Sequence, residues 1–533
     1  MEKLRLYAKT VPITFESWVI SYIGIVLVRT LLEQYPSFQV GHFVLIDLPT
    51  IFHYIASYLA ITVTLMTILL FFGKTSMQEV SVIAIFGSFI IWIAPIIDLI
   101  WGGIGGHLIS YFFIPGQELA LRFVTFFGGH ITSGITLGIQ IETLLGIIFC
   151  YLYIYSATKN IYRSLTGAFA FYCLIFFIFS IPSLIALFLP DQGDQFIAIL
   201  KSIDASSLVQ NNIHPNFNAS NIGLIDLAFN KLMASVNVLL ALVMSLFFFY
   251  LGMREKFLAV MKNSRPERIF HFFLLFIFGA SLSIFFTTFL KSWINIQSFL
   301  LALIALTGAW VYSVCQNDMY DETIDSVSNK DRPLIGKELT KSDMDVISKV
   351  FLFITFLSAY TLGHYILFFI SLFLFVYYIY SNPPLRLKRF VILNSFLVSL
   401  ACLSVIMAGF FLVNPDKNIL AFPPGLVLAI IIFFTAVTNI RDIKDVEGDR
   451  ADGIKTLPVL LGTKKAKMLI AATICFFFLL IPWYFHVSFL LIPSIIASLL
   501  SWYFITEKNY KEWKGFAVYM LYLILIIGTF ILK

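Results

Sequence analysis

Charged residues are scarce in this sequence. Asp, Glu, Lys and Arg make up 12% of its 533 residues, whereas 59% are hydrophobic and 17% are aromatic. Such a low share of charge excludes a soluble domain. Helices satisfy their own backbone polar groups in lipid, so the composition predicts an all-α, polytopic membrane protein.

Cysteine is also rare, and all five cysteines fall within or at the ends of apolar runs: Cys150, Cys173, Cys315, Cys402 and Cys475. We expect small buried hydrophobes rather than disulfides or a metal cluster.

The net charge of +6 does not indicate nucleic acid, because the basic residues follow the membrane topology. No cleavable signal peptide is evident, since the first apolar run lacks a small-residue cleavage site.

Fifteen apolar runs are candidate membrane spans. Six lie in the first half, at 15–33, 52–73, 80–101, 134–156, 167–189 and 231–252. Nine follow, at 270–289, 296–316, 347–363, 364–380, 391–413, 424–440, 467–482, 487–503 and 515–532. The segment 103–130 is apolar but interrupted by Gly and Pro, which leaves it open as a re-entrant or interfacial segment.

The distribution of basic residues predicts the orientation. With the amino terminus inside and alternating spans, 29 of the 36 Lys and Arg fall on the cytoplasmic side. We expect an N-terminal transmembrane domain over 1–252, a basic cytoplasmic linker over 253–269 that suits anionic headgroups, and a second domain over 270–533. The polar outer loop, about 190–230, carries one glycosylation sequon at Asn218.

Two acidic stretches, 317–325 and 441–449, organise the second domain. Aspartates recur with the same steps of three and four in both: Asp318, Asp321 and Asp325, then Asp442, Asp445 and Asp449. This spacing predicts that each trio lies on one face of a helix. Each stretch follows an apolar run, so both trios are expected at the membrane boundary, where charge indicates function by default.

Each acidic stretch is followed by a related tail. Residues 331–336 and 455–462 both contain a cation, then a proline, apolar residues and a glycine. This pattern indicates an internal repeat of two helical units. Two such units facing each other would form a pocket with carboxylates on both walls.

Diphosphate binding is the chemistry that requires this arrangement. Mg²⁺ is usually held by one or two carboxylates together with substrate phosphates, so two carboxylate clusters suit two or more ions on one diphosphate. The candidates to neutralise the other phosphate oxygens are Arg332, Arg386, Lys388, Arg389 and Lys455. The Phe- and Tyr-rich spans suit an isoprenoid tail and an allylic cation.

Residues of about 265–533 resemble the UbiA superfamily of intramembrane prenyltransferases. The first matching motif is Asn317-Asp318-x-x-Asp321-x-x-x-Asp325 with Asp331-Arg332-Pro333, and the second is the stretch from Tyr380 to Arg389. The third is Asp442-x-x-Asp445-x-x-x-Asp449-Arg450 followed by Gly453-Ile454-Lys455-Thr456-Leu457-Pro458. Their joint occurrence, in order and on one membrane face, is specific.

The resemblance implies a nine-helix bundle with a central cavity that opens sideways to lipid, and a Mg²⁺-dependent transfer of a prenyl group from a polyprenyl diphosphate to a hydrophobic acceptor. The implied metal ligands are Asn317, Asp321 and Asp325 with Asp318 beside them, and Asp442, Asp445 and Asp449. The implied diphosphate ligands are Arg332, Lys388 and Lys455, to which the charge pattern adds Arg386. Tyr380 would lie beside the allylic carbon, and the catalytic set would be Asp321, Asp325, Asp445, Asp449 and Tyr380.

Two other functions stay open at this point: an intramembrane terpene cyclase, and a divalent-cation transporter that uses the acidic residues. The acceptor is not identified, although the motifs favour an aromatic or ring compound. Residues 1–252 lie outside the resemblance and are a candidate for binding another membrane component. Their polar residues indicate either a metal site or satisfied helix-end residues: Asp98, His107, Glu118, His130 and Glu142.

Overall fold

The computed structural model of the chain describes residues 1–39, 48–101, 111–112, 116–128, 135–187, 221–451 and 453–532. Within these ranges the chain is helical and contains no extended β-strand, and 14 helical segments are long and apolar enough to cross a membrane. The predicted class, an all-α polytopic membrane protein, is confirmed. The chain divides into two compact units, Met1–Arg254 and Glu255–Lys533.

The first unit contains six of the membrane-length segments within its described residues. Its helices are α1 (Glu2–Thr10), α2 (Phe15–Gln39), α3 (Leu48–Gly73), α4 (Met77–Ser88), η1 (Phe89–Trp92), α5 (Ile93–Trp101), α6 (Gly116–Val124), α7 (Leu137–Thr158), α8 (Ile161–Leu187) and α11 (Asn221–Gly252). The run predicted at 80–101 is therefore three consecutive helical pieces. His107, His130 and the Asn218 sequon lie outside the described residues.

Asp98 and Glu142, two of the candidate polar residues in the first unit, have protein partners, whereas Glu118 is exposed. Asp98 accepts hydrogen bonds from the Thr136 hydroxyl at 2.5 Å and from the Gly138 backbone at 2.9 Å, at the start of α7. Glu142 pairs with the buried Arg29 at 3.1 Å. These contacts are those of helix-end and interhelical residues.

The second unit begins with α12 (Arg254–Asn263), α13 (Pro266–Ser281), α14 (Phe286–Phe289), α15 (Trp293–Tyr320), α16 (Glu322–Ser328), α17 (Lys341–Thr361), α18 (His364–Ser381), η2 (Leu387–Arg389) and α19 (Val391–Val413). It continues with η3 (Ile419–Ala421), α20 (Pro424–Val437), η4 (Thr438–Ile443), α21 (Val446–Ala451), α22 (Leu457–Leu461), α23 (Thr463–Tyr484), η5 (Ser488–Leu490), α24 (Leu491–Thr506) and α25 (Glu512–Ile531).

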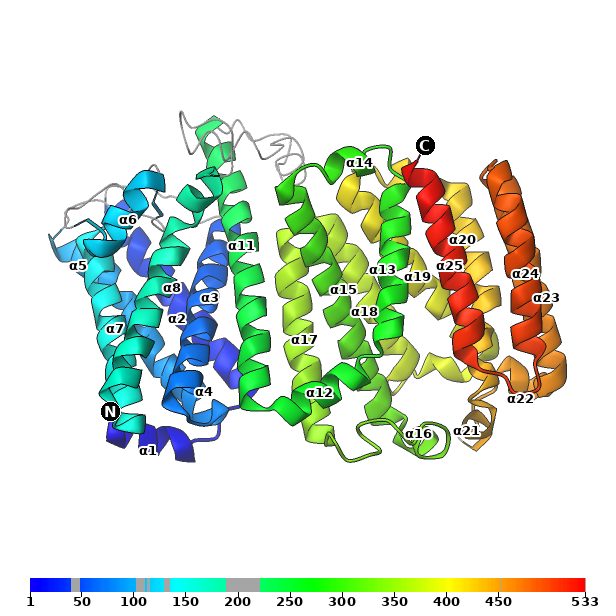
Figure 1. The fold of residues 1–533 in the computed structure, drawn as a ribbon, viewed down its shortest axis with the longest axis horizontal. Coiled ribbons are helices and arrows are strands. Elements are labelled where there is room, and N and C mark those ends of the chain that lie inside the picture. The colour runs from blue at the N-terminus through cyan, green and yellow to red at the C-terminus, as the bar shows by residue number, and fades with distance from the viewer. Residues whose placement is uncertain are drawn as a thin grey trace. The chain divides into compact units, whose positions relative to one another are not determined.

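Eight membrane-length segments belong to this described part of the second unit, and α13, with 16 residues, is a ninth and shorter apolar helix. Figure 1 shows the short helices α12, α16, α21 and α22 at one end of the unit, where the long helices stop. The basic segment at 253–269 folds into α12 and the start of α13. Lys256 pairs with Asp343 at 2.7 Å, so α12 is bound to the start of α17.

Two glycines allow α13 and α19 to pack closely. A Cβ at Gly279 would lie 1.9 Å from the carbonyl oxygen of Ile406, and a Cβ at Gly409 would lie 1.9 Å from that of Phe276. Any side chain at either position would therefore push the two backbones apart. Close approach of helices at small residues is typical of packing in membranes.

Candidate active site

Each acidic stretch lies across a break between two helices. α15 ends at Tyr320 and α16 begins at Glu322, so Asp321 lies at the junction. In the second stretch, η4 ends at Ile443 and α21 begins at Val446, which places Asp445 in the gap. The prediction that each trio lies on one face of a single helix is wrong. Repulsion between like charges, added to the negative end of the helix dipole, disfavours a continuous helix here.

Both acidic stretches face one cavity of about 230 Å³ in the second unit. Nine of the residues singled out from the sequence line it: Asn317, Asp321, Asp325, Arg332, Tyr380, Lys388, Asp442, Asp445 and Asp449. The helices α16 and α21, which follow the two breaks, lie against each other. The two trios are thus brought to opposite sides of one small space, as the internal repeat predicted.

Basic side chains neutralise the first trio. Asp318 pairs with Arg265 at 2.5 Å and with Arg332 at 2.7 Å, and Arg332 also pairs with Asp325. Asp321 pairs with Lys388 and accepts a hydrogen bond from Arg386 at 2.9 Å. All three carboxylates are more than nine-tenths buried, so these partners are needed to offset their loss of solvation.

Four predicted site residues are not among those that line the cavity. Asp318 is buried behind it between its two arginines, and Arg386 is buried against Asp321. Lys455 and Arg389 are exposed. The roles assigned to these four residues stay predictions, and the geometry gives Asp318 and Arg386 contacts to other protein groups.

Polar side chains contact the second trio, and Arg441 and Lys388 act electrostatically on Asp442 and Asp449 respectively. Asn394 donates to Asp442 at 3.3 Å, and the Thr456 hydroxyl donates to Asp449 at 3.2 Å. One oxygen of Asp445, Oδ1, is buried without a hydrogen-bond partner. None of these three carboxylates forms an ion pair with any residue that the structure describes.

Burial changes the acidity of carboxylates in both clusters. Burial raises the pKa of Asp325 to about 6, against the opposing effect of Arg332. Burial, and then the neighbouring Asp445, raise the pKa of Asp449 to about 6. Burial also lowers the pKa of Lys388, although its ion pair with Asp321 opposes the shift. The cavity therefore favours the arrival of a further cation.

The donor set suits a hard cation. Carboxylate and amide oxygens are the ligands that Mg²⁺ accepts, and it keeps several waters while taking one or two carboxylates plus substrate phosphates. The unpartnered oxygen of Asp445 is an available ligand of this kind. No group of three acidic, His or Cys side chains encloses a metal position among the described residues, so a bound ion would complete its shell with water or substrate.

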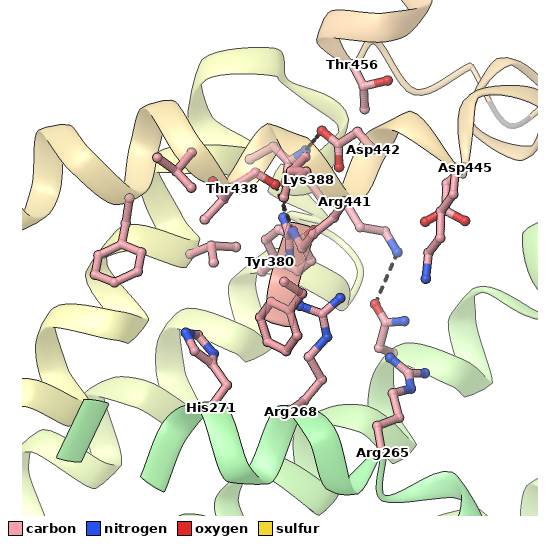
Figure 2. Close-up of a pocket in the computed structure, with 18 of the residues that line it drawn as sticks. Arg265, Arg268, His271, Tyr380, Lys388, Thr438, Arg441, Asp442, Asp445 and Thr456 are labelled. Atoms are coloured by element: carbon pink, nitrogen blue, oxygen red, sulfur yellow. Dashed lines mark hydrogen bonds between the residues drawn. The ribbon is translucent and has the colours of Figure 1, made fainter. Parts of the chain in front are cut away.

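The sequence did not single out several residues that line the cavity. Arg265, Arg268 and His271 come from the start of α13, in or next to the segment interpreted as a linker. Arg268 and His271 point from α13 toward Tyr380 and Arg441 (Figure 2). Arg441 directly precedes the second trio, so its position was visible, but only the fold shows that it lines the cavity.

A second cavity of about 380 Å³ adjoins the first and is lined by apolar and aromatic side chains of α13, α19, α20, α23 and α25. Phe434, Phe478 and Tyr519 line both cavities. The polar site therefore continues into a space that suits a hydrocarbon chain. The fold and the site together define a membrane protein in which a polar cavity continues into an apolar one.

Comparison with known sequences finds a family that matches part of this unit. Residues 277–525 match the UbiA prenyltransferase family. The resemblance stated from the motifs is confirmed.

The homogentisate phytyltransferase of Synechocystis is 29% identical over 169 residues, which are 29% of this chain and 54% of the relative. The chlorophyll synthase of Arabidopsis thaliana is 31% identical over 183 residues, which are 32% of this chain and 44% of the relative. The chain thus spans about half the length of the curated relatives it matches. A solved structure of a UbiA homologue from Archaeoglobus fulgidus, bound to GPP and Mg²⁺, covers 51% of this chain and 99% of its own. Its identity is 17% and its TM-score 0.37, a value that does not by itself establish a shared fold.

Proposed function

We propose that the second unit catalyses a Mg²⁺-dependent transfer of a prenyl group from a polyprenyl diphosphate to a lipid-soluble acceptor that carries an aromatic or other ring. The observation that carries this proposal is the meeting of the two acidic trios around one cavity that continues into an apolar space. The match of residues 277–525 to the UbiA prenyltransferase family supports it. The predicted topology puts the site at the cytoplasmic face of the membrane.

The metal ligands in this proposal are Asp321 and Asp325 with Asn317 on one side, and Asp442, Asp445 and Asp449 on the other. Bound Mg²⁺ would supply Lewis-acid stabilisation of the diphosphate oxygens. Asp318 keeps its predicted place beside the first set, where it positions Arg265 and Arg332. The unpartnered oxygen of Asp445 makes the second trio the more open of the two sites.

The basic side chains on the first wall bind the donor headgroup. Arg332 and Lys388 line the cavity and are held by Asp325 and Asp321. Asp321 and Asp325 would hold the cation, and Arg332 and Lys388 would contact phosphate oxygens. Their charge then stabilises the negative charge that develops on the leaving group.

The apolar wall supports the other half of the reaction. The bond between the allylic carbon and the diphosphate oxygen breaks with its electron pair on oxygen. The acceptor carbon or oxygen then bonds to that allylic carbon and loses its proton to diphosphate or water. Tyr377 and Tyr380 lie at the cavity wall, where their ring faces stabilise positive charge and the surrounding phenylalanines exclude water.

The two alternatives differ in what they require. A divalent-cation transporter needs carboxylates along a path through the bilayer, whereas α16 and α21, the helices that follow the two breaks, lie at the end of the second unit where the long helices stop (Figure 1). A terpene cyclase would use the same site without a second substrate. Incubation of the protein with donor alone separates this case, because a cyclic hydrocarbon product forms only in a cyclase.

The direct test uses the purified full chain in nanodiscs with a labelled polyprenyl diphosphate and a panel of phenolic and lipid acceptors. We expect label in a prenylated product with Mg²⁺ and none with chelator. Asp321→Asn should abolish product formation. Glu322→Gln is the matched control, because Glu322 is the next residue but is exposed and pairs with Lys341 at 2.6 Å. Full activity of Asp321→Asn, or metal flux into vesicles without donor, would contradict the proposal.

A further inference from the structure

A lysine lies inside the second acidic stretch. Lys444 follows the last residue of η4 and stands between Asp442 and Asp445 along the chain, and all three residues line the polar cavity. Lysine carries a compact charge on a flexible stem of four carbons, so its ammonium can reach carboxylates in several directions. An ammonium that pairs with a carboxylate competes with a metal ion for the same oxygens. The partner that Lys444 takes therefore bears on the second metal site.

The partner of Lys444 is a carboxylate outside the trio. Its Nζ lies 2.7 Å from Oε2 of Glu512, the first residue of α25, and Oε1 of the same carboxylate pairs with Arg268 of α13. The Glu512 side chain is only 14% exposed. Glu512 also acts electrostatically on Asp442. The ammonium of Lys444 is thus held on Glu512, although the trio lies within electrostatic reach.

The start of α25 is fixed on two sides. The Tyr510 hydroxyl donates to the carbonyl oxygen of Ile440 in η4 at 3.0 Å. The guanidinium of Arg268 lies 4.6 Å from the centre of the ring of Phe516, which is one turn after Glu512. These contacts tie the start of α25 to η4 and to α13. Glu512 is therefore held in place beside the second acidic stretch.

The oxygen that this arrangement leaves open belongs to the residue after Lys444. Oδ1 of Asp445 is buried and has no hydrogen-bond partner. An ammonium that is not held by Glu512 has this oxygen as a neighbour, and a charge-assisted hydrogen bond there would occupy a ligand that a hard cation requires. With Lys444 on Glu512, the oxygen stays free for the ion.

We propose that Glu512 is a positioning residue, which holds the ammonium of Lys444 away from the second acidic trio and so keeps Asp445 available to Mg²⁺. This inference rests on the proposed function and concerns its second metal site. Glu512 is not among the residues that line the cavity. Loss of its charge therefore acts through Lys444, and replacement of Lys444 reverses the effect.

The first test measures metal affinity on the purified full chain in nanodiscs, by electron paramagnetic resonance with Mn²⁺ as the probe. We expect Glu512→Gln to weaken Mn²⁺ binding by about tenfold, because a charged hydrogen bond from Lys444 then competes for the carboxylates. Glu512→Asp keeps the charge and should keep most of the affinity. Glu507→Gln is the matched control, because Glu507 pairs with Lys514 at 2.9 Å in the same part of the chain and should bind Mn²⁺ like the native protein.

The second test removes both partners of the ion pair. Lys444→Gln alone should bind Mn²⁺ at least as tightly as the native chain. The double variant Glu512→Gln with Lys444→Gln should regain the native affinity. A general loss of structure would not be reversed in this way, since Arg268 still lacks its carboxylate. If the double variant binds as weakly as Glu512→Gln, or if Glu512→Gln binds like the native chain, the proposal is overturned.

Turnover gives a readout that separates positioning from catalysis. Glu512→Gln should require about tenfold more Mg²⁺ for its half-maximal rate and should reach the native kcat when Mg²⁺ is saturating. A lower kcat at saturating Mg²⁺ with no change in the Mg²⁺ requirement contradicts the role of Glu512.

A crosslink tests the contact without metal or donor. A carbodiimide activates a carboxylate, and an amine in contact with it displaces the urea and forms an amide. We expect mass spectrometry to find this amide between Lys444 and Glu512 in the native chain, and its absence there overturns the proposal. A native chain that forms the crosslink but binds Mn²⁺ no better than Asp445→Asn contradicts the metal site of the proposed function instead.

Discussion

Nη2 of Arg386 lies 2.9 Å from Oδ1 of Asp321, and both side chains are buried. The sequence had assigned Arg386 to the diphosphate and Asp321 to the metal. The contact joins them and leaves Arg386 outside the cavity lining. A base that holds a metal ligand in place has a different effect on kinetics from one that touches the substrate, and this difference can be measured.

Arg386→Gln should lower stability because Asp321 loses one of its two buried basic partners, at a cost of about 2 kcal/mol. We expect the KM for the donor to stay within about threefold, since Arg386 does not reach the cavity. Lys388→Gln, which removes a base that lines the cavity, should raise that KM by about tenfold or more. Equal effects of the two variants on the KM for the donor would show that Arg386 binds the diphosphate.

Asp445→Asn should lower turnover without lowering the stability of the metal-free protein. The buried oxygen of Asp445 has no protein partner, so its removal breaks no contact and the melting temperature without metal should hold or rise. Turnover should fall about 100-fold or more, and Mg²⁺ should raise the melting temperature less than in the native chain. A large loss of stability without metal would show that Asp445 has a structural role.

Asp318→Asn, unlike Asp445→Asn, should lower the stability of the fold. Two arginines lose a buried carboxylate, which destabilises the fold by about 3 kcal/mol in a denaturation experiment in detergent. The control is Asp345→Asn, because Asp345 forms an exposed pair with Lys349 at 2.7 Å and should change stability by less than about 0.5 kcal/mol. If the two variants have the same free energy of unfolding, the buried ion pairs of Asp318 do not stabilise the fold.

The effect of Mg²⁺ on stability should depend on pH. The pKa values of Asp325 and Asp449 are raised to about 6, so both groups bind protons in the folded protein at pH values where the unfolded chain has lost them. Without metal, stability should therefore rise as the pH falls through 6 toward about 4. The increase in melting temperature with Mg²⁺ should be largest above about pH 7 and vanish near pH 5, because protons compete for the same oxygens. If the increase in melting temperature with Mg²⁺ does not depend on pH, the ion binds at a site without Asp325 and Asp449.

Gly409→Ala should lower stability or prevent folding, because the new Cβ would lie 1.9 Å from the carbonyl oxygen of Phe276 and would separate α13 from α19. Since α13 carries Arg265 and Arg268 to the cavity, residual folded protein should also bind donor poorly. Gly528→Ala is the control: nothing lies within 4 Å of a Cβ there, so we expect a neutral change or a gain of up to about 1 kcal/mol. The melting temperature of each variant in nanodiscs gives the comparison.

Hydropathy alone determined the membrane spans, because lipid offers no water to exposed backbone groups and only long apolar helices satisfy them. The runs at 391–413 and 364–380 match α19 and α18 almost residue for residue. The two acidic trios were equally visible, since their spacing and their basic tails are local features of the chain. Those features were sufficient for the class of protein and for nine of the side chains that line the cavity.

The pairing of charges required the tertiary structure. Asp318 meets Arg265 from 53 residues away, and Asp321 meets Lys388 from 67 residues away, distances along the chain over which no periodicity carries information. The helix breaks at Asp321 and Asp445 also depend on buried charge. Local helix propensity gives no information about which charges are buried. Which carboxylate a basic residue holds, as Arg386 holds Asp321, is decided by which helices pack together, because Coulomb interactions act through space and not along the sequence.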